Sequence, residues 1–189
     1  MDTGPELHED FRRVRSAFEG RLVRLRPPEP EDARRLNPMF GDPHVLAGLT
    51  IPFPQPTTAF VEWVEAARHA DDSAAFVIET LDGEAIGACD LRDMNDRNRS
   101  ANLGIWIGKP YWGRGFGTDA VRTLCRLGFR HMNLQRIWLV VHADNPRGRR
   151  AYEKVGFIME GTLRRAQFVR GAYVDAQVMS LLVEEFVDG

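Results

Sequence analysis

The stretch Tyr111-Trp112-Gly113-Arg114-Gly115-Phe116-Gly117-Thr118 places three glycines at alternate positions. It lies between a strand-like run, residues 103–108, and a helix-like run, residues 118–131. Alternating glycines let successive backbone N–H groups turn toward one point, because no Cβ atom obstructs them. A helix that begins there adds its own unpaired N–H groups and the positive end of its dipole. The stretch therefore predicts an anion site, and the usual anion at such a site is phosphate or pyrophosphate.

Other phosphate-binding motifs do not fit this spacing. A dinucleotide fingerprint, G-x-G-x-x-G, would need glycine where Thr118 stands if it began at Gly113, and where Ala120 stands if it began at Gly115. The run G-x-x-x-x-G-K-[ST] of a nucleotide-triphosphate loop does not occur in the chain. A short glycine nest suited to one pyrophosphate remains, and a strand-to-helix turn that merely needs glycine is the structural alternative.

The composition is that of an ordinary soluble globular protein. The chain has 189 residues, 43% of them hydrophobic and 28% charged, which is enough for one domain with a full core. The net charge of −2 does not favour nucleic acid as a partner. Cys89 and Cys125 lie in apolar runs without metal-ligand spacing, so we expect buried thiols in a reducing compartment and no metal. Without a transmembrane-length apolar run or a signal peptide, we expect a cytoplasmic protein with no membrane partner.

Hydrophobic periodicity divides the chain into an N-terminal extension, residues 1–19, and one folded domain, residues 20–189. The extension has apolar residues at the spacing of an amphipathic helix, namely Leu7, Phe11, Val14 and Phe18. In the domain, the patterns predict strands at 21–26, 75–80, 85–92, 101–108, 136–143, 157–162 and 174–183, and helices from about 31, after 57 or 58, and over 118–131 and 145–155. An irregular loop is predicted over 41–58 and a polar excursion between the last two strands. This order indicates an α/β or α+β fold around one mixed sheet.

Three segments in order make the chain resemble the GNAT superfamily of N-acetyltransferases. It is most similar to the RimJ/RimL-type branch, which acetylates N-terminal amines of ribosomal proteins among other amines. The resemblance covers about residues 20–186 and implies a single domain whose central sheet is mixed, mostly antiparallel and flanked by helices. The segments that carry it are residues 102–108 with 111–120, residues 145–147 with 151–157, and residues 160–164 with 171–175 and 178–181.

The resemblance implies that the cofactor is acetyl-CoA, used as a co-substrate, and that no metal takes part. Its pyrophosphate would be held by N–H groups of the glycine loop, and its pantetheine arm would pair with the strand before Pro110. Pro110 ends that strand and leaves its last polar groups free for a ligand. Trp112 stands where the family loop often begins with Gln or Arg. The alternative interpretation of Trp112 is that it is a structural anchor. The expected cofactor-binding residues are Ile105, Trp106, Ile107, Gly113, Arg114, Gly115, Phe116, Gly117, Thr118, Asn145, Tyr152 and Lys154.

Tyr152 and Asn145 are the residues for which the resemblance implies a catalytic role. Similar enzymes carry a tyrosine facing the CoA sulfur at the position of Tyr152, four residues before Gly156. A phenol donates a hydrogen bond to a leaving thiolate and then its proton. The alternative is that Tyr152 packs the short helix on the sheet. Asn145 is a helix cap in either case, and the resemblance adds contact with the pantetheine.

The general base is not assigned by the sequence. Relatives often have Glu where this chain has Asn102, and an amide cannot accept the proton. The candidates are Asp90, His142, Asp144 and Asp175, with a structural role as the alternative for each; a water chain or the neutral fraction of the substrate would also suffice. Neutralising a lysine amine of pKa about 10.4 at pH 7 costs about 4–5 kcal/mol, and an α-amine near 7.8 only about 1. A chain without a strong base therefore favours an α-amine or another amine of low pKa.

The expected function is transfer of an acetyl group from acetyl-CoA to a primary amine, by direct attack on the thioester. The acceptor is either a protein N-terminal α-amine or a small-molecule amine. A non-catalytic acyl-CoA-binding or regulatory protein on the same fold is one alternative, and a transferase of another acyl group is another. Residues 41–58 and 164–173 are the expected walls of the acceptor site, and the branch pattern at Glu160, Arg164 and Asp175 suggests that they shape it. Similar proteins are often dimers, so a homodimer is also among the expectations.

Overall fold

The structure, a computed structural model, describes residues 17–49 and 53–188. The helix expected within the N-terminal extension lies almost wholly outside these residues. Seven strands form one sheet in the order β1-β2-β3-β4-β5-β7-β6. The strands are β1 (Val23–Arg26), β2 (Ala74–Thr80), β3 (Ala85–Asn95), β4 (Ser100–Ile107), β5 (Arg136–His142), β6 (Ile158–Val169) and β7 (Ala172–Leu182). The helices are α2 (Ala33–Phe40), α3 (Pro43–Leu46), α4 (Thr57–His69), α5 (Phe116–His131) and α6 (Pro146–Glu153), with short 3-10 turns η1 (Pro30–Asp32), η2 (Lys109–Tyr111) and η3 (Val183–Glu185).

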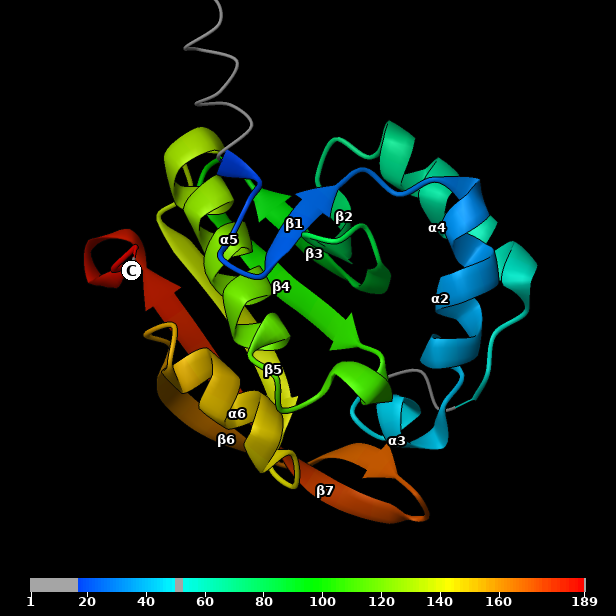
Figure 1. The fold of residues 1–189 in the computed structure, drawn as a ribbon. Coiled ribbons are helices and arrows are strands. Elements are labelled where there is room, and N and C mark those ends of the chain that lie inside the picture. The colour runs from blue at the N-terminus through cyan, green and yellow to red at the C-terminus, as the bar shows by residue number, and fades with distance from the viewer. Residues whose placement is uncertain (1–16, 50–52, 189) are drawn as a thin grey trace, which may run out of the picture.

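The sheet opens between its two central strands (Figure 1). Strands β4 and β5 are the parallel pair of this sheet, and they pair only over residues 100–102 and 136–138. The carbonyl of Arg99 accepts a hydrogen bond from Gln135 N–H (2.6 Å) on the β5 side. Because hydrogen-bonding groups alternate in direction along a strand, Leu103, Ile105 and Ile107 direct their backbone groups toward β5. Beyond residue 102 the register with β5 ends, so this edge of β4 borders a gap.

Helices cover the sheet on both faces (Figure 1). Helix α5 packs on one face, where Val121, Leu124 and Cys125 join Leu103 of β4 in the larger apolar cluster. Helices α2 and α4 cover the other face with a smaller cluster formed by Leu36, Val77 and Ala85, against which Phe60 and Trp106 pack. Cys89 and Cys125 are both buried and unbridged, as expected, and burial raises the pKa of each thiol. The mixed, mostly antiparallel sheet flanked by helices is confirmed.

Two connections differ from their prediction. The expected irregular loop at 41–58 contains α3, which begins where the Asp42 carboxylate accepts a hydrogen bond from His44 N–H (2.7 Å) and Pro43 occupies the first turn. The expected polar excursion at 164–173 is the end of a long β6–β7 hairpin, which turns at Arg170 and Gly171 with positive φ angles of 50° and 83°. Most of β6 is exposed, so no apolar alternation marks it as a strand.

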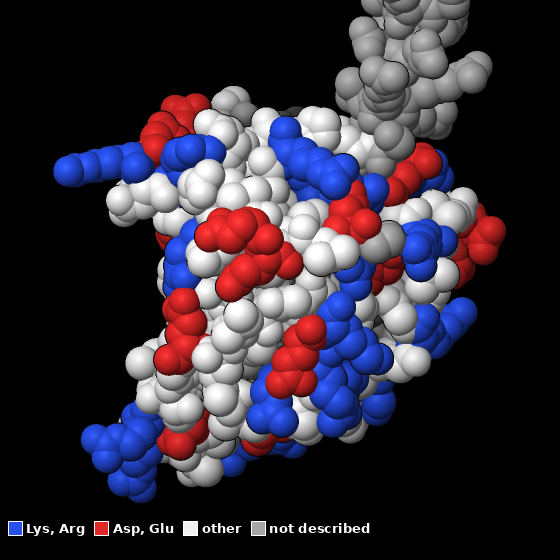
Figure 2. Space-filling view, turned by 90° about the vertical axis from the view of Figure 1, so that its left-hand side faces the viewer, with Lys and Arg blue, Asp and Glu red and all other residues white. Residues whose placement is uncertain are grey.

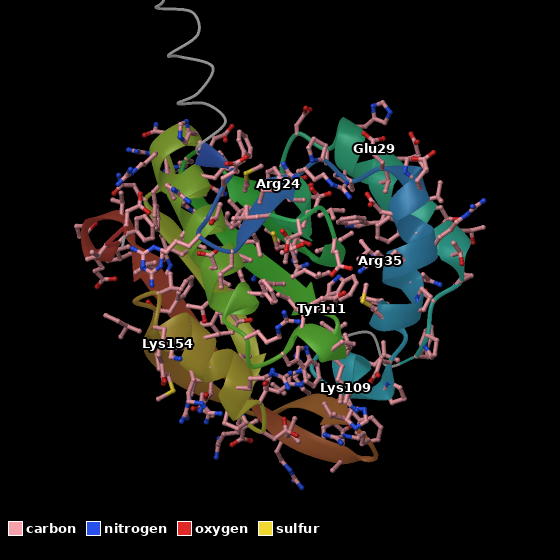
Figure 3. The ribbon with its side chains drawn as sticks, in the orientation of Figure 1. Arg24, Glu29, Arg35, Lys109, Tyr111 and Lys154 are labelled. Carbon is pink, nitrogen blue, oxygen red and sulfur yellow. The ribbon has the colours of Figure 1, made fainter. Side chains whose placement is uncertain are left out.

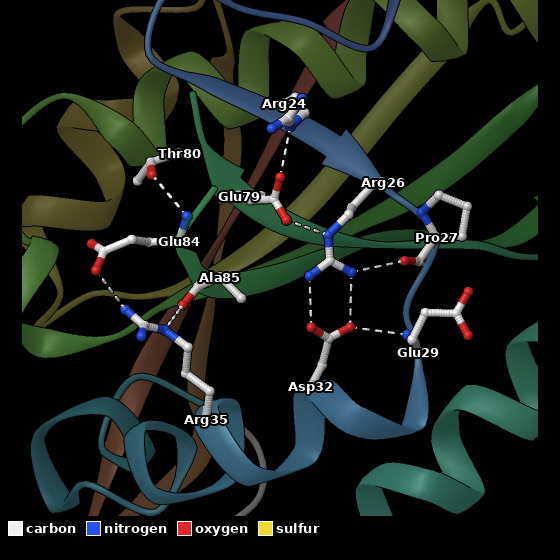
Figure 4. A network of polar contacts seen from close by, with 10 residues as sticks. All are labelled: Arg24, Arg26, Pro27, Glu29, Asp32, Arg35, Glu79, Thr80, Glu84 and Ala85. Atoms are coloured by element: carbon white, nitrogen blue, oxygen red, sulfur yellow. Dashed lines mark hydrogen bonds and ion pairs between the residues drawn. The ribbon is translucent and has the colours of Figure 1, made fainter. Parts of the chain in front are cut away.

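A cluster of ion pairs ties the first helical turns to the edge of the sheet (Figure 4). The guanidinium of Arg26 donates to both carboxylate oxygens of Asp32 (2.8 and 2.6 Å) and to Glu79 (2.5 Å). Glu79 also accepts from Arg24 (2.6 Å), and Asp32 from the N–H of Glu29 (2.9 Å). Burial opposes ionisation of Asp32 and Glu79, but the hydrogen bonds from the arginines outweigh it and lower both pKa values. The cluster therefore fixes η1 and the start of α2 against β1 and β2.

We expect Asp32→Asn to lower the free energy of unfolding by about 1–3 kcal/mol, because Arg26 loses its bidentate carboxylate in a site that is largely shielded from water. Since the folded-state pKa values of Asp32 and Glu79 are lowered, their contribution is present above the ordinary carboxyl pKa and disappears as pH falls through the folded values. Urea titrations between pH 7 and pH 3 measure both effects, and the difference between wild type and variant should shrink at the acid end.

The matched control for this prediction is Asp82→Asn, at the exposed turn between β2 and β3. We expect its unfolding free energy to stay within about 0.5 kcal/mol of wild type, as for most surface substitutions. Equal losses for the two variants, or a difference that does not change with pH, would show that the Arg26 cluster is not a stabilising unit.

Candidate active site

The glycine loop has the geometry of an anion-binding nest. Gly113 and Gly115 adopt φ angles of 75° and 90°, which residues with a Cβ atom rarely adopt. The N-cap of α5 is Gly115, which provides no side-chain cap. The helix begins at Phe116 rather than at the predicted Thr118. The first backbone hydrogen bond of the helix runs from Asp119 N–H to the Gly115 carbonyl (3.0 Å). Among the described residues, the N–H groups of residues 116–118 therefore have no acceptor, as an anion site requires.

A pocket of about 150 Å³ joins this loop to the gap beside β4. Its walls come from α3 and the residues after it, β4, the glycine loop and α6. They comprise Val45, Gly48, Leu49, Ile105, Trp106, Ile107, Tyr111, Trp112, Gly113, Gly115, Gly117, Thr118, Val121, Asn145, Arg147, Gly148, Ala151 and Tyr152. The expected wall from residues 41–58 is thus partly present, whereas no residue of 164–173 lines this pocket. Free N–H groups at one end and an unpaired strand edge along the side fit a long phosphorylated ligand such as acetyl-CoA.

Trp112 closes the end of β4. Its indole Nε1 donates a hydrogen bond to the carbonyl of Ile107 (2.6 Å). The expectation that the last polar groups of this strand stay free is therefore wrong for the Ile107 carbonyl. The backbone of Trp106 faces β3 by the alternation of the strand, and its side chain packs on Phe40 of α2 with ring centroids 5.2 Å apart. Ile105 is thus the residue of the expected triplet whose N–H and carbonyl both border the gap.

Tyr111, just before the loop, is held from outside the pocket. Its hydroxyl accepts a hydrogen bond from Arg35 of α2 (2.9 Å) and donates one to Glu84 (3.3 Å), while Arg35 also donates to the Ala85 carbonyl (2.7 Å). Figure 3 shows Arg35 and Tyr111 next to each other between α2 and η2. These contacts fix the start of the glycine loop relative to α2 and the β2–β3 turn.

Helix α6 brings both proposed catalytic residues to the same pocket as the glycine loop. Asn145 caps the helix, since its side-chain oxygen accepts a hydrogen bond from Gly148 N–H (3.0 Å), which confirms the predicted cap. Tyr152 lines the pocket about two helical turns after Asn145 and packs its ring on Phe157, with centroids 5.9 Å apart. Burial raises the pKa of Tyr152 to about 12, so the phenol keeps its proton at neutral pH.

Three expected cofactor residues do not line the pocket. The guanidinium of Arg114 lies over the rings of Tyr111 and Phe116, at 5.8 and 5.0 Å from their centroids. Phe116 is buried in the core that α5 covers. Lys154 is exposed at the far end of α6, where its carbonyl accepts a hydrogen bond from Arg122 (2.9 Å), and Figure 3 shows it well apart from Tyr111. Their roles in cofactor binding stay predictions.

None of the four candidates for the general base lines the pocket. His142 is 4% exposed, and its Nδ1 atom has no hydrogen-bond partner among the described residues. Burial raises the pKa of Asp90, whose nearest cation is Arg92 at 3.3 Å. Asp175 accepts a hydrogen bond from the N–H of Arg165 (2.8 Å) within the β6–β7 hairpin, and Asp144 is exposed. None of the four therefore lies on the wall that Tyr152 shares with the glycine loop, and each stays a candidate.

Glu160, one of the residues that match the branch pattern, is held by other side chains of the sheet. Its carboxylate accepts hydrogen bonds from both terminal nitrogens of Arg136 (2.6 and 2.5 Å) and from Ser180 (2.7 Å). These hydrogen bonds, that from Arg136 first, lower the pKa of Glu160 to about 2. Glu160 does not line the pocket, so the structure gives it a role in holding β6 and β7 against β5.

Arg147 also lines the pocket, although it is not among the expected cofactor-binding residues. It follows Pro146 at the start of α6, and its guanidinium carbon lies 3.3 Å from the centroid of the Trp112 ring. The sequence shows four basic residues around this helix and no feature that separates Arg147 from Arg149, Arg150 and Lys154. Arg147 is distinguished from these three residues only by the fold, which puts the start of α6 beside the glycine loop.

The sheet that opens at its centre, the glycine nest and the tyrosine of α6 together define an acyltransferase that binds a phosphorylated carrier. Residues 22–158 match the family described as Acetyltransferase (GNAT) domain, and the chain belongs to this family. The resemblance stated from the sequence is therefore confirmed. The protein is an acetyl-CoA-dependent N-acetyltransferase.

Curated relatives include two with named substrates. Spermidine N(1)-acetyltransferase of Escherichia coli K12 is 32% identical over 168 residues, which cover 87% of this chain and 88% of that protein. Ribosomal-protein-serine acetyltransferase of the same organism is 27% identical over 101 residues, covering 53% and 56%. The two relatives act on different amines, so their names alone leave the acceptor of this chain open.

Solved structures agree in fold and in cofactor. Spermidine N-acetyltransferase from Vibrio cholerae, in complex with CoA and spermine, matches with a TM-score of 0.81 and 26% identity over 86% of this chain and 96% of that one. RimJ of Mycobacterium smegmatis, in complex with CoA-disulfide, matches with a TM-score of 0.77 and 28% identity over 86% and 83%. Within the described part of the chain, no helix is long and apolar enough to cross a membrane, and no group of three or more metal-ligating side chains occurs.

Proposed function

We propose that this enzyme acetylates an α-amine, such as a protein N-terminus, or another weakly basic primary amine, rather than a polyamine. The observation that carries the proposal is the charge of the pocket. None of the described residues that line it is Asp or Glu, and its one charged side chain is Arg147. A polyamine brings several ammonium groups, which no carboxylate among these lining residues would balance.

Different residues of the pocket have different roles in the reaction. Bound acetyl-CoA supplies the acetyl thioester. The N–H groups at the start of α5 bind its pyrophosphate, and the backbone groups of Ile105 orient its pantetheine arm. Tyr152 holds a proton on its phenol oxygen at neutral pH and donates it to the departing sulfur, and the proton that the amine nitrogen loses as the amide forms restores the phenol. Asn145 keeps α6, and with it Tyr152, in register with the glycine loop.

The lack of a base at the pocket supports the same acceptor class. An amine that must arrive neutral pays about 1 kcal/mol at pH 7 if its pKa is near 7.8, but about 4–5 kcal/mol if its pKa is near 10.4. The difference corresponds to a factor of several hundred in the reactive fraction. A site without a positioned base therefore selects amines of low pKa by their chemistry.

We expect a peptide with a free α-amine to be acetylated with a kcat/KM at least about 10-fold above that of spermidine at pH 7. The assay is release of the CoA thiol with both acceptors at saturating acetyl-CoA. The same peptide with a blocked N-terminus and one internal lysine is the matched control, and it should react at least about 10-fold more slowly. The rate with the α-amine should rise from pH 6 to pH 8 and then level off, as the amine loses its proton.

Polyamine acetylation is the second candidate, because the spermidine acetyltransferase of E. coli covers most of this chain at 32% identity. A kcat/KM for spermidine above that of the free α-amine would establish it and overturn the first proposal. Mass spectrometry of the acetylated product distinguishes the two, since it identifies which nitrogen carries the acetyl group.

The proposal also covers organisation and location. Residues 20–189 are the acetyltransferase domain and residues 1–19 an extension of it; the protein works in the cytoplasm as a homodimer without nucleic acid or membrane partners. The β6–β7 hairpin supports a dimer, because it exposes the stacked pair Phe168 and Tyr173 at 61% and 64%. On the face seen in Figure 2, acidic side chains lie among the basic ones, so that face forms no continuous basic surface for nucleic acid. Light scattering at micromolar concentration tests the dimer, and a monomer mass would reject it.

A further inference from the structure

Arg147 is held in place by an aromatic platform. Its guanidinium carbon lies 3.3 Å from the centroid of the Trp112 ring, a stacking contact. The indole is itself fixed, since its Nε1 donates to the Ile107 carbonyl at 2.6 Å and its ring packs against the main apolar cluster. A cation from α6 is therefore pre-positioned beside the glycine loop, 35 residues away from its platform in the sequence.

Arg147 differs from Arg149 on the same helix and from Arg122 of α5 in having no partner for its donors. Arg149 pairs with Glu153 (3.3 Å), and Arg122 donates to the carbonyls of Lys154 and Val187 (both 2.9 Å). Arg147 makes no ion pair or hydrogen bond with its side chain to any described residue, and desolvation alone lowers its pKa. A guanidinium stays charged at neutral pH and presents five N–H donors in a planar fork. Stacking covers a face of that fork and leaves its edge free for a ligand.

We propose that Arg147, oriented by Trp112, binds the pyrophosphate of acetyl-CoA together with the N–H groups of the glycine loop. Arg147 lines the same pocket as Gly113, Gly115 and Gly117, so both sets of donors meet at one anion. A planar fork matches two phosphate oxygens at once, which a single N–H group does not. The inference rests on the acetyl-CoA site described above and adds to it a charged residue that sets affinity and position.

The test compares three ligands by titration calorimetry. CoA carries the pyrophosphate and the 3′-phosphate, dephospho-CoA lacks only the 3′-phosphate, and pantetheine lacks both. We expect Arg147→Gln to weaken binding of CoA and of dephospho-CoA by the same factor, about 10–100-fold, and to leave pantetheine unchanged. Arg147→Lys should recover part of the loss, because it keeps the charge but loses the fork.

Arg150→Gln is the matched control, because it removes one positive charge from an exposed position of the same helix. It should change the CoA dissociation constant by less than about threefold. An equal loss in the two variants, a loss for CoA but not for dephospho-CoA, or no loss with Arg147→Gln would each overturn the proposal. Thermal unfolding of each variant shows whether a loss of affinity reflects a loss of fold.

The role of Trp112 is tested by a double-mutant cycle. If the indole orients the guanidinium, the losses from Trp112→Leu and Arg147→Gln should be less than multiplicative in the CoA dissociation constant. Independent, fully multiplicative losses would overturn the platform. Failure of the α-amine proposal would leave these constants unchanged, because they are measured without an acceptor, and wild-type binding of CoA reports separately on the cofactor site.

Discussion

Tyr152→Phe is expected to lower kcat by about 10²–10³-fold while the dissociation constant of CoA stays within about threefold. The substitution removes one oxygen and keeps the ring, so the packing of Tyr152 on Phe157 and the wall of the pocket are retained. A positioned acid typically contributes 10²–10⁴-fold to a proton transfer, and a 10²-fold loss corresponds to about 2.7 kcal/mol of transition-state stabilisation. Stopped-flow or steady-state thiol release measures kcat, and calorimetry measures binding.

The pH profile provides a second readout of the same residue. Because burial raises the pKa of Tyr152 to about 12, the phenol remains protonated across the range in which the enzyme is assayed. Wild-type kcat/KM should therefore rise with the neutral fraction of the amine and show no fall up to about pH 10. A descending limb near pH 8 would identify a different group as the acid. In the variant the rising limb should keep its position, since it belongs to the substrate.

Tyr173→Phe is the matched control, because it removes the same hydroxyl from a ring that is 64% exposed on the β6–β7 hairpin. Its kcat should stay within about twofold of wild type. If Tyr152→Phe retained full activity, the tyrosine of α6 would be a packing residue only. If it lost activity and CoA binding together, the phenol would hold the cofactor rather than donate the proton.

The sequence predicted the parts of the site that depend on local backbone chemistry. The glycines between a strand and a helix imply free N–H groups, and Asn145-Pro146 implies a cap; both features follow from steric and hydrogen-bonding rules that act within a few residues. The sequence likewise predicted the strands that have one buried face. The helix inside 41–58 had its signal in Asp42-Pro43, which the richness in glycine and proline obscured.

The missed features depend on contacts between distant segments. Nothing in the sequence around Arg147 indicates that it stacks on Trp112, because that contact exists only once α6 lies beside the glycine loop. The hydrogen bond from Trp112 to Ile107 joins residues that are close in the sequence, but it requires the chain to turn back through η2. The length of the β6–β7 hairpin was missed for a different reason. Its backbone pairing is satisfied whatever side chains it carries, and a strand that is exposed on both faces needs no alternation of apolar and polar residues.

Gly117→Glu is expected to weaken CoA binding at least about 100-fold without lowering the stability of the protein. Gly117 lies in the first turn of α5 and lines the pocket, and a Cβ atom there would be 3.8 Å from Ile107 Cδ1, an ordinary contact. Its φ angle is not in the left-handed region. Replacing glycine in a helix gains up to about 1 kcal/mol, and an acid in the first turn gains about 0.3–1 kcal/mol more. The carboxylate occupies the place where the pyrophosphate must bind and repels it.

Gly117→Gln separates charge from size in this experiment, because glutamine has the same length without the negative charge. It should weaken CoA binding less than glutamate does, and added salt should narrow the gap between the two. Gly161→Glu adds the same carboxylate at an exposed position of β6, where a Cβ atom would meet nothing within 4 Å and φ is not in the left-handed region, and should leave CoA binding unchanged. Equal losses of affinity for Gly117→Glu and Gly117→Gln would mean that size and not charge causes the loss, and wild-type affinity in both variants would mean that the helix N-terminus does not bind the anion.

A substitution at Gly117 is expected to weaken CoA binding but to favour the stability of the helix. These opposite effects make Gly117 informative about the site as a whole. Local helix energetics favour almost any residue over glycine at this position, so the fold does not require glycine there. The access of a ligand to the N–H groups of the first turn does require it, since every side chain would narrow the pocket between α5 and Ile107. A variant that unfolds at a higher temperature than wild type, yet no longer binds CoA, would show that this glycine serves the cofactor at a cost in stability.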